Sequence, residues 1–215
     1  MLEKITEKIE KAARGAGRLT RNITLIAVSK QQPPARIEAA LQAGIRIFGE
    51  NRVQEAQMRW HARRALYPDL HLHLIGPLQS NKASDAVALF DVFHTIDRPK
   101  IASALKEEMD KQNRQLPCFI QVNTGEEPQK AGIAPAEAAD FLSYCRKEIG
   151  LNICGLMCIP PIDEEAAMHF ALLKSLAHRL ALPQLSMGMS GDFEEAIGFG
   201  ATHIRVGSAL FGSRS

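Results

Sequence analysis

The chain lacks the features that would place it in a membrane or on a nucleic acid. No apolar run approaches the ~20 residues that cross a bilayer, and the N-terminal stretch "MLEKITEKIEKAARGAG" has no uninterrupted apolar core of the signal-peptide kind. Neither charge is in excess, because 26 basic and 24 acidic side chains leave a formal net charge of +2. These absences predict a cytoplasmic protein with no membrane and no nucleic-acid partner.

Cysteine is scarce, with four residues in the whole chain. Cys118, Cys154 and Cys158 stand within short apolar runs, and Cys145 stands in a helical pattern. We therefore expect buried free thiols rather than disulfides or metal ligands.

Obvious metal-ligand clusters are also missing. The run "HLHL" places His71 and His73 on one strand face, and His94 and His203 on later strands are conceivable partners. No carboxylate is placed to complete such a site. We predict no metal, and histidines that are packed inside the fold or hydrogen-bonded.

What the sequence does contain is an alternation of short apolar runs with helical patterns. The predicted strands are Ile23–Ser29, Arg46–Gly49, Leu72–Gly76, Val92–Ile96, Cys118–Asn123, Ile153–Ile159, Gln184–Met189 and His203–Gly207. The predicted helical stripes are Leu2, Ile5, Ile9 and Ala12; Ile101, Leu105 and Met109; and Phe170, Leu173, Ala177 and Leu180. Trp60 fits a further stripe with Val53 and Ala56. Helix starts are expected after Pro33 and after Asp163.

Eight strand and helix units without a linker predict an α/β fold, a single (β/α)8 TIM barrel that forms one domain over residues 1–215. The competing fold is an open doubly wound sheet. Its glycine-rich G-x-G-x-x-G turn is absent after the first strand, where "VSKQQPP" stands instead. The barrel is therefore the preferred prediction.

Lys30 comes directly after the first predicted strand. The carboxyl ends of the strands form the working face of a barrel, so this lysine would face the barrel mouth. Partial burial there would lower its pKa and make the neutral amine available for attack on a carbonyl carbon. A lone lysine at a strand end is more often a solvated charge, and the barrel context is what favours the chemical role.

Glycine and hydroxyl residues follow the last two predicted strands, in "SMGMSGD" and "RVGSALFG". Barrels often bind phosphate at these two loops through backbone N–H groups. Ser190 and Gly191 belong to the first loop, and Gly207 and Ser208 to the second. Turn glycines and a serine helix cap would explain either loop alone. Together with Lys30 they describe a site for pyridoxal 5'-phosphate (PLP), which has an aldehyde at one end and a phosphate at the other.

The same residues stand in longer blocks that resemble a known family. The blocks are "VSK", "FGENRVQEA", "HLIGPLQSNK", "IQVNTGEEPQKAGI", "GLMCIPP", "SMGMSGDFEEAI" and "IRVGSALFG". In this order, from Ile23 to Gly212, they are similar to the pyridoxal phosphate homeostasis proteins, the YggS/PROSC family. The segment before Ile23 is shorter than is usual in that family.

The resemblance implies a fold like the N-terminal barrel of alanine racemase, which is the fold-type III class of PLP proteins. It implies that Lys30 holds PLP as an internal aldimine and that Arg205 faces the pyridine nitrogen. Asn51 in "FGEN" would line the cofactor pocket. The implied phosphate contacts are Ser190, Gly191, Gly207 and Ser208.

By the same resemblance, the function is intracellular PLP homeostasis by a monomer, through buffering or delivery of the cofactor, with effects on amino-acid and keto-acid balance. PLP-dependent apo-enzymes are the candidate partners. The alternatives are a fold-type III enzyme, such as an amino-acid racemase or decarboxylase, and a barrel that forms its Schiff base with substrate as class I aldolases do.

Two observations weaken the racemase alternative. Alanine racemases add a C-terminal β-domain, whereas this chain ends soon after the eighth predicted strand. They also use a tyrosine as a second acid–base group, and the two tyrosines here, Tyr67 and Tyr144, lie in or at the end of helical patterns. We therefore expect no catalytic residues of the racemase kind and a protein that is not primarily an enzyme.

Overall fold

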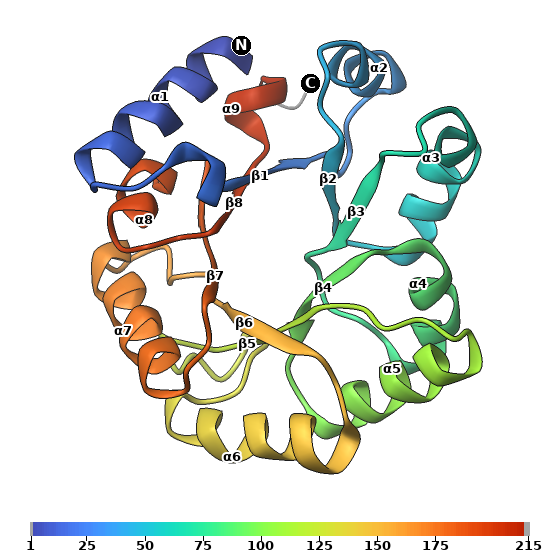
Figure 1. Cartoon of the computed structure of the whole chain (residues 1–215), viewed down its shortest axis with the longest axis vertical. Coiled ribbons are helices and arrows are strands. Elements are labelled where there is room, and N and C mark those ends of the chain that lie inside the picture. The colour runs from blue at the N-terminus through green and yellow to red at the C-terminus, as the bar shows by residue number, and fades with distance from the viewer. Residues whose placement is uncertain (1, 213–215) are drawn as a thin grey trace.

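Eight parallel strands close into a barrel in the computed structural model, which describes residues 2–212 (Figure 1). The strands are β1 Thr24–Val28, β2 Ile47–Glu50, β3 His71–Leu74, β4 Val92–Ile96, β5 Cys118–Gln121, β6 Ile153–Met157, β7 Gln184–Met189 and β8 His203–Val206. Each strand pairs with its neighbours in the sequence, and β8 pairs with β1, where Val206 lies opposite Ala27. The predicted (β/α)8 barrel is confirmed, because an open sheet would leave two unpaired edges.

All eight predicted strands form, and most differences lie at their ends. β4 and β7 have the predicted limits, whereas β1 ends at Val28 instead of Ser29 and β6 ends at Met157 instead of Ile159. At β6 the apolar run continues past the last strand residue, because Cys158 in the following loop is also buried, whereas Ser29 after β1 is a polar residue that is buried and hydrogen-bonded to Gly49 and Glu50. Lys30 accordingly lies in a turn two residues after β1.

Helices surround the barrel on its outer face (Figure 1). They are α1 Leu2–Gly15, α2 Pro34–Gln42, α3 Val53–Leu66, α4 Ala83–Leu89, α5 Pro99–Lys111, α6 Ala138–Ser143, α7 Ala166–Arg179, α8 Phe193–Gly198 and α9 Ser208–Phe211. The start predicted at Pro33 is confirmed, since Pro33 caps α2. The start predicted after Asp163 is wrong by two residues: Glu164 and Glu165 stay outside α7, and Glu164 Oε2 lies 3.2 Å from His169 Nε2.

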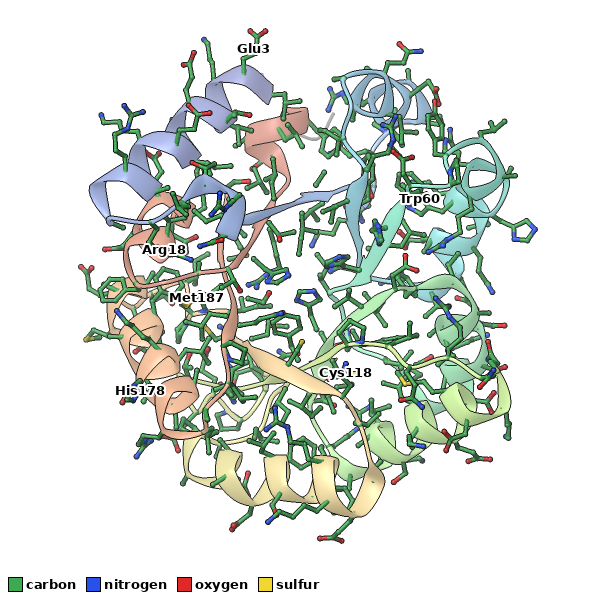
Figure 2. All side chains as sticks on the ribbon, viewed as in Figure 1. Glu3, Arg18, Trp60, Cys118, His178 and Met187 are labelled. Carbon is green, nitrogen blue, oxygen red and sulfur yellow. The ribbon has the colours of Figure 1, made fainter. Side chains whose placement is uncertain are left out.

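The main hydrophobic core lies between the strands and the helices. The predicted stripes bury most of their members, including Ile5 and Ile9 on α1 and Leu105 on α5. Trp60 on α3 points into the layer between helices and strands (Figure 2) and is fully buried. Its ring packs at a tilt against Phe48 of β2, with ring centroids 4.5 Å apart. Each helix therefore presents one apolar face to the barrel, which is the condition for covering a sheet that is buried on both sides.

The helix before the first strand also belongs to this layer. α1 packs against α8 and α9, outside β1 and β8 (Figure 1). Arg18, just after α1, donates from Nη1 to the carbonyl oxygens of Ile197 and Ala201, at 2.9 and 2.8 Å. The segment before Ile23 thus supplies a packed helix.

Two predictions from composition can be compared with the described residues. The four cysteines are free, as predicted, and burial raises the pKa of Cys145, Cys154 and Cys158 to about 12. Within residues 2–212, no helix combines the length and the apolar character that a membrane span needs.

Candidate functional site

A cavity of about 280 Å³ opens at the carboxyl ends of neighbouring strands β7, β8, β1 and β2. The site residues predicted from the sequence all line it: Lys30, Asn51, Ser190, Gly191, Arg205, Gly207 and Ser208. Its volume is close to the lower end of the ~300–1,000 Å³ range of small-molecule sites. Lys30 and Arg205 are the charged members of the described lining, and no carboxylate is among them. The cavity therefore favours an anionic ligand.

Lys30 is held in place by the residue that precedes it. Ser29 is fully buried, and its hydroxyl donates to Glu50 Oε1 at 2.7 Å, while its backbone N–H donates to the Gly49 carbonyl at 3.1 Å. Gln31, which follows Lys30, has a left-handed backbone with φ of 58°. The turn that carries Lys30 is thus anchored to the end of β2 on one side and bends sharply on the other.

Asn51 is positioned by close packing of two loops. A Cβ added to Gly76, after β3, would lie 2.3 Å from the Asn51 carbonyl oxygen and 2.6 Å from its Cα. Any side chain at position 76 would push the Asn51 backbone away from its present place. The glycine of "HLIGP" is therefore a site residue that the sequence patterns did not single out.

A bulge near the end of β7 aims the following loop at the cavity. Ser186 of β7 pairs with His203 of β8, and Met189 pairs with Arg205, so β7 has one residue more than β8 between these two pairs. Gly188, inside the bulge, has φ of 91°, and a Cβ there would lie 2.5 Å from the Cβ of Ala196. Only glycine fits both the backbone and the space.

Ser190 joins the two loops that were predicted to bind phosphate. Its Oγ accepts the backbone N–H groups of Gly207 and Ala209, at 3.1 and 3.3 Å. A hydroxyl has two acceptor lone pairs and one proton, so the Ser190 proton remains for a further acceptor. A Cβ on Gly191 would meet no atom within 4 Å, which shows that open space lies beside the backbone there.

Arg205 forms the buried cationic part of the cavity wall. It is 4% exposed, and its Nη1 donates to Ser186 Oγ and its Nη2 to the Cys158 carbonyl, both at 2.7 Å. Burial lowers the pKa of Arg205, whereas Cys158 and Asp192 raise it. A guanidinium nevertheless stays protonated in proteins, so Arg205 presents a fixed positive charge.

Below the cavity, His73, His94 and His203 occupy the inside of the barrel, as the sequence predicted, whereas His71 at the start of β3 is exposed. His73 and His94 are buried and lie 2.9 Å apart, between Nδ1 of the first and Nε2 of the second. The His94 ring stacks on Phe119 with centroids 4.4 Å apart, and His203 lies edge-on to both rings. Within residues 2–212, no three His, Cys, Asp or Glu residues are grouped to hold a metal ion.

These histidines predict a loss of stability in acid. Burial lowers the pKa of His73 to about 3, that of His203 to about 4 and that of His94 well below its usual value. The unfolded chain, with ordinary histidine pKa values near 6.5, therefore binds protons first as the pH falls. The contribution of these histidines to the free energy of unfolding is therefore fully present above about pH 6.5. Between about pH 6.5 and pH 4 it decreases by about 1.4 kcal/mol per pH unit for each such histidine.

Urea unfolding at pH 7, 6 and 5 measures this slope. His73→Gln should reduce it by about 1.4 kcal/mol per pH unit, because one buried titrating group is removed. His178→Gln, on the exposed side of α7, is the matched control and should leave the slope unchanged. An identical slope in the wild type and in His73→Gln would contradict the prediction.

The sequence patterns missed the apolar part of the cavity wall. It consists of Val28, Ile75, Ile159 and Met189. Val28 and Met189 end β1 and β7, and the other two residues closely follow β3 and β6. Ile159 and Met189 are 39% and 37% exposed. The sequence signal that could have identified these lining residues is an apolar residue at or just after the carboxyl end of a predicted strand.

A larger cavity, of about 870 Å³, lies between α1, α2 and α9. Leu2, Arg36, Ala40 and Phe211 are among its lining residues, and none of the predicted site residues reaches it. Ligand sites are marked by polar groups that converge on an apolar pocket, not by size alone. The smaller cavity at the barrel mouth is therefore the candidate site.

Comparison with known proteins first defines the class. Residues 2–215 match the family model described as alanine racemase, N-terminal domain. The chain is also 42% identical to the pyridoxal phosphate homeostasis protein of Pseudomonas aeruginosa, over 99% of this chain and 94% of that protein. Its identity to the protein of the same name from Escherichia coli is 39%, over 99% and 95% of the two chains.

A solved structure gives the same result. The structure of PipY from Synechococcus elongatus with PLP bound superposes with a TM-score of 0.81 at 39% identity, and covers 95% of this chain and all of that one. The chain therefore belongs to the family of pyridoxal phosphate homeostasis proteins.

Proposed function

We propose that this protein binds PLP in the cavity at the barrel mouth and takes part in PLP homeostasis by buffering or delivering the cofactor. Lys30 is the residue that would hold the cofactor covalently, through a Schiff base between its amine and the cofactor aldehyde with loss of water. Relatives at about 40% identity carry this function in their name, and the PipY structure contains PLP.

The observation that carries the proposal is the convergence of the seven predicted residues on one cavity. The strand order β7, β8, β1 puts Arg205 between the Lys30 turn and the Ser190 loop. An amine on one side and hydroxyl and N–H donors on the other suit a ligand with an aldehyde and a phosphate at opposite ends. The proposed phosphate contacts are Ser190, Gly191, Gly207 and Ser208.

Arg205 limits the chemistry that the cofactor could support. Its fixed charge beside the ring nitrogen would disfavour protonation of that nitrogen, which weakens the ring as an electron sink. Transaminase chemistry, which depends on a protonated ring, is therefore disfavoured. Arg205 would instead orient the ring through a hydrogen bond that it donates.

The tyrosines give no support to the racemase alternative. Tyr67 donates from its hydroxyl to Glu38 Oε1 at 2.9 Å, and the Tyr144 hydroxyl lies 3.3 Å from Ser103 Oγ. Both contacts join outer helices, and neither tyrosine lines the cavity. A second acid–base group of the racemase kind is thus not placed by these two residues.

We further propose that the chain acts as a single PLP-binding domain over residues 1–215, as a monomer in the cytoplasm, with PLP-dependent apo-enzymes as receivers of the cofactor. The closed barrel uses strands and helices from most of the chain for one shared core, which supports a single folding unit. Gel filtration would test whether the protein is a monomer. Transfer assays with apo-enzymes would test whether they receive the cofactor.

Absorbance spectroscopy tests the function. The purified protein should take up added PLP, develop the visible band of a protein-bound Schiff base and retain it through dialysis. With L-amino acids in deuterium oxide, α-proton exchange should remain as slow as with free PLP at the same concentration. A protein that never takes up PLP would overturn the proposal, and sustained exchange at enzymatic rates would favour the racemase alternative.

A further inference from the structure

A chain of hydrogen bonds crosses the inside of the barrel from Arg205 to the opposite strands. Arg205 Nη1 donates to Ser186 Oγ at 2.7 Å, and Ser186 Oγ lies 2.8 Å from His94 Nδ1. His94 Nε2 in turn lies 2.9 Å from His73 Nδ1. The four residues come from β8, β7, β4 and β3, and none is more than 4% exposed.

The charge of Arg205 and the burial of Ser186 together set the direction of the bonds in this chain. A guanidinium can only donate, so Ser186 Oγ accepts from Arg205. Ser186 is fully buried, and among the described residues His94 Nδ1 is the acceptor within reach of its single proton, which would stay unpaired if His94 donated instead. His94 must then carry its own proton on Nε2 and donate it to His73 Nδ1. His73 therefore also has its proton on Nε2. Both imidazoles are neutral, in agreement with the lowered pKa values that burial causes.

The groups around the chain leave Arg205 without an ion pair. Its two acceptors, Ser186 Oγ and the Cys158 carbonyl, are neutral. Within residues 2–212, no carboxylate lies within 4.0 Å of its guanidinium, although Asp192 is close enough to influence its pKa. The other titratable rings near the chain are His203, whose centroid is 5.7 Å from that of His94, and His71, which helps to lower the pKa of His73. The positive charge is thus held in place but not neutralised.

We propose that Ser186 and His94 are positioning residues that hold the Arg205 guanidinium in the cavity wall through a hydrogen-bond chain of fixed direction. Because Arg205 cannot accept a proton, the chain does not conduct protons to the cavity. It instead determines where the remaining N–H groups of Arg205 point. The consequence for the cofactor ring rests on the proposed function, whereas the direction of the bonds does not.

The direction of the hydrogen bonds from Arg205 to His73 is tested by NMR near neutral pH, on the full chain labelled with ¹⁵N-histidine. Long-range ¹H–¹⁵N correlations should show a protonated Nε2 and an unprotonated Nδ1 for both His73 and His94. The same pattern is expected before and after addition of PLP. A proton on His94 Nδ1, in either a neutral or a charged ring, would overturn the inference.

The positioning role is tested by PLP titration of three variants. Ser186→Ala should weaken PLP binding by about tenfold, because a buried charged donor loses its acceptor, and should shift the spectrum of the bound cofactor. Ser186→Thr keeps the hydroxyl and should restore both. Tyr67→Phe removes a hydroxyl that donates to Glu38 Oε1 at 2.9 Å away from the cavity, and should change neither.

The outcomes separate this inference from the proposed function. If Ser186→Ala binds PLP with the wild-type affinity and spectrum, Ser186 does not position Arg205. If the wild type does not bind PLP at all, the proposed function fails, and the NMR result alone decides the hydrogen-bond chain. Should Ser186→Thr fail to fold, the comparison of Ser186→Ala with Tyr67→Phe still gives the answer.

Discussion

Lys30→Ala is expected to abolish the covalent attachment of PLP and leave the barrel folded. Lys30 is the lysine that lines the cavity with Ser190, Arg205 and Ser208, and it stands in a turn outside the hydrophobic core. Without its amine, no bond to the cofactor aldehyde can form there. The visible band should be lost, and borohydride should no longer fix the cofactor to the protein, as mass spectrometry would show.

Lys82→Ala is the matched control for this experiment. Lys82 lines a second cavity, which shares Asn51 with the candidate site, together with Arg52 and Arg98. Its removal should leave the visible band and the reduced adduct intact. A Lys30→Ala protein that still carries a borohydride-fixed cofactor would show that another lysine is the attachment point.

Glu50→Ala should destabilise the protein by about 3 kcal/mol, because it breaks a buried ion pair and leaves its donors unpaired. Glu50 is fully buried, and its Oε1 accepts from Ser29 Oγ, Arg59 Nη1 and Trp60 Nε1, at 2.7, 2.6 and 2.9 Å. These three donors come from the Lys30 turn and from α3. The carboxylate therefore ties the site to the surrounding helix layer.

Two further variants sharpen this prediction in urea unfolding. Glu50→Gln keeps an acceptor oxygen of the same shape and should cost only about 1 kcal/mol. Glu194→Gln, whose carboxylate pairs with Lys8 at 2.7 Å on the surface, should cost less than about 0.5 kcal/mol. Equal stability of Glu50→Ala and wild type would mean that the buried cluster contributes little.

The fold could be predicted in detail because its signals are local. Eight apolar runs and the helical stripes between them are readable along the chain, and each matching strand and helix forms. The errors lie at the ends of elements, as at Ile159, where an apolar residue stands beyond the last residue of β6, and at Asp163, where two acidic residues separate it from the first residue of α7. The periodicity of apolar residues indicates which face of a strand or helix is buried. It does not indicate the residue at which the regular backbone hydrogen bonding begins or ends.

The candidate site was only partly accessible to this reasoning. Lys30 and Ser190 stand out because each follows a strand and carries a chemical group suited to one end of the cofactor. Glu50 and His94 gave no comparable signal, since a glutamate or histidine near a strand can be buried, exposed or catalytic. Their roles depend on partners that are far away in the sequence, such as Ser186, 92 residues from His94.

By itself the sequence determined the barrel, the order of its strands and the residue types that meet at its mouth, because parallel strands of a barrel all end on one face. Only the tertiary structure decided which of these residues share a cavity and how they are held. The close approach of Gly76 to Asn51, the bulge at Gly188 and the hydrogen-bond chain from Arg205 to His73 all arise between strands. Such contacts depend on register and on the closure of β8 against β1, which no local pattern encodes.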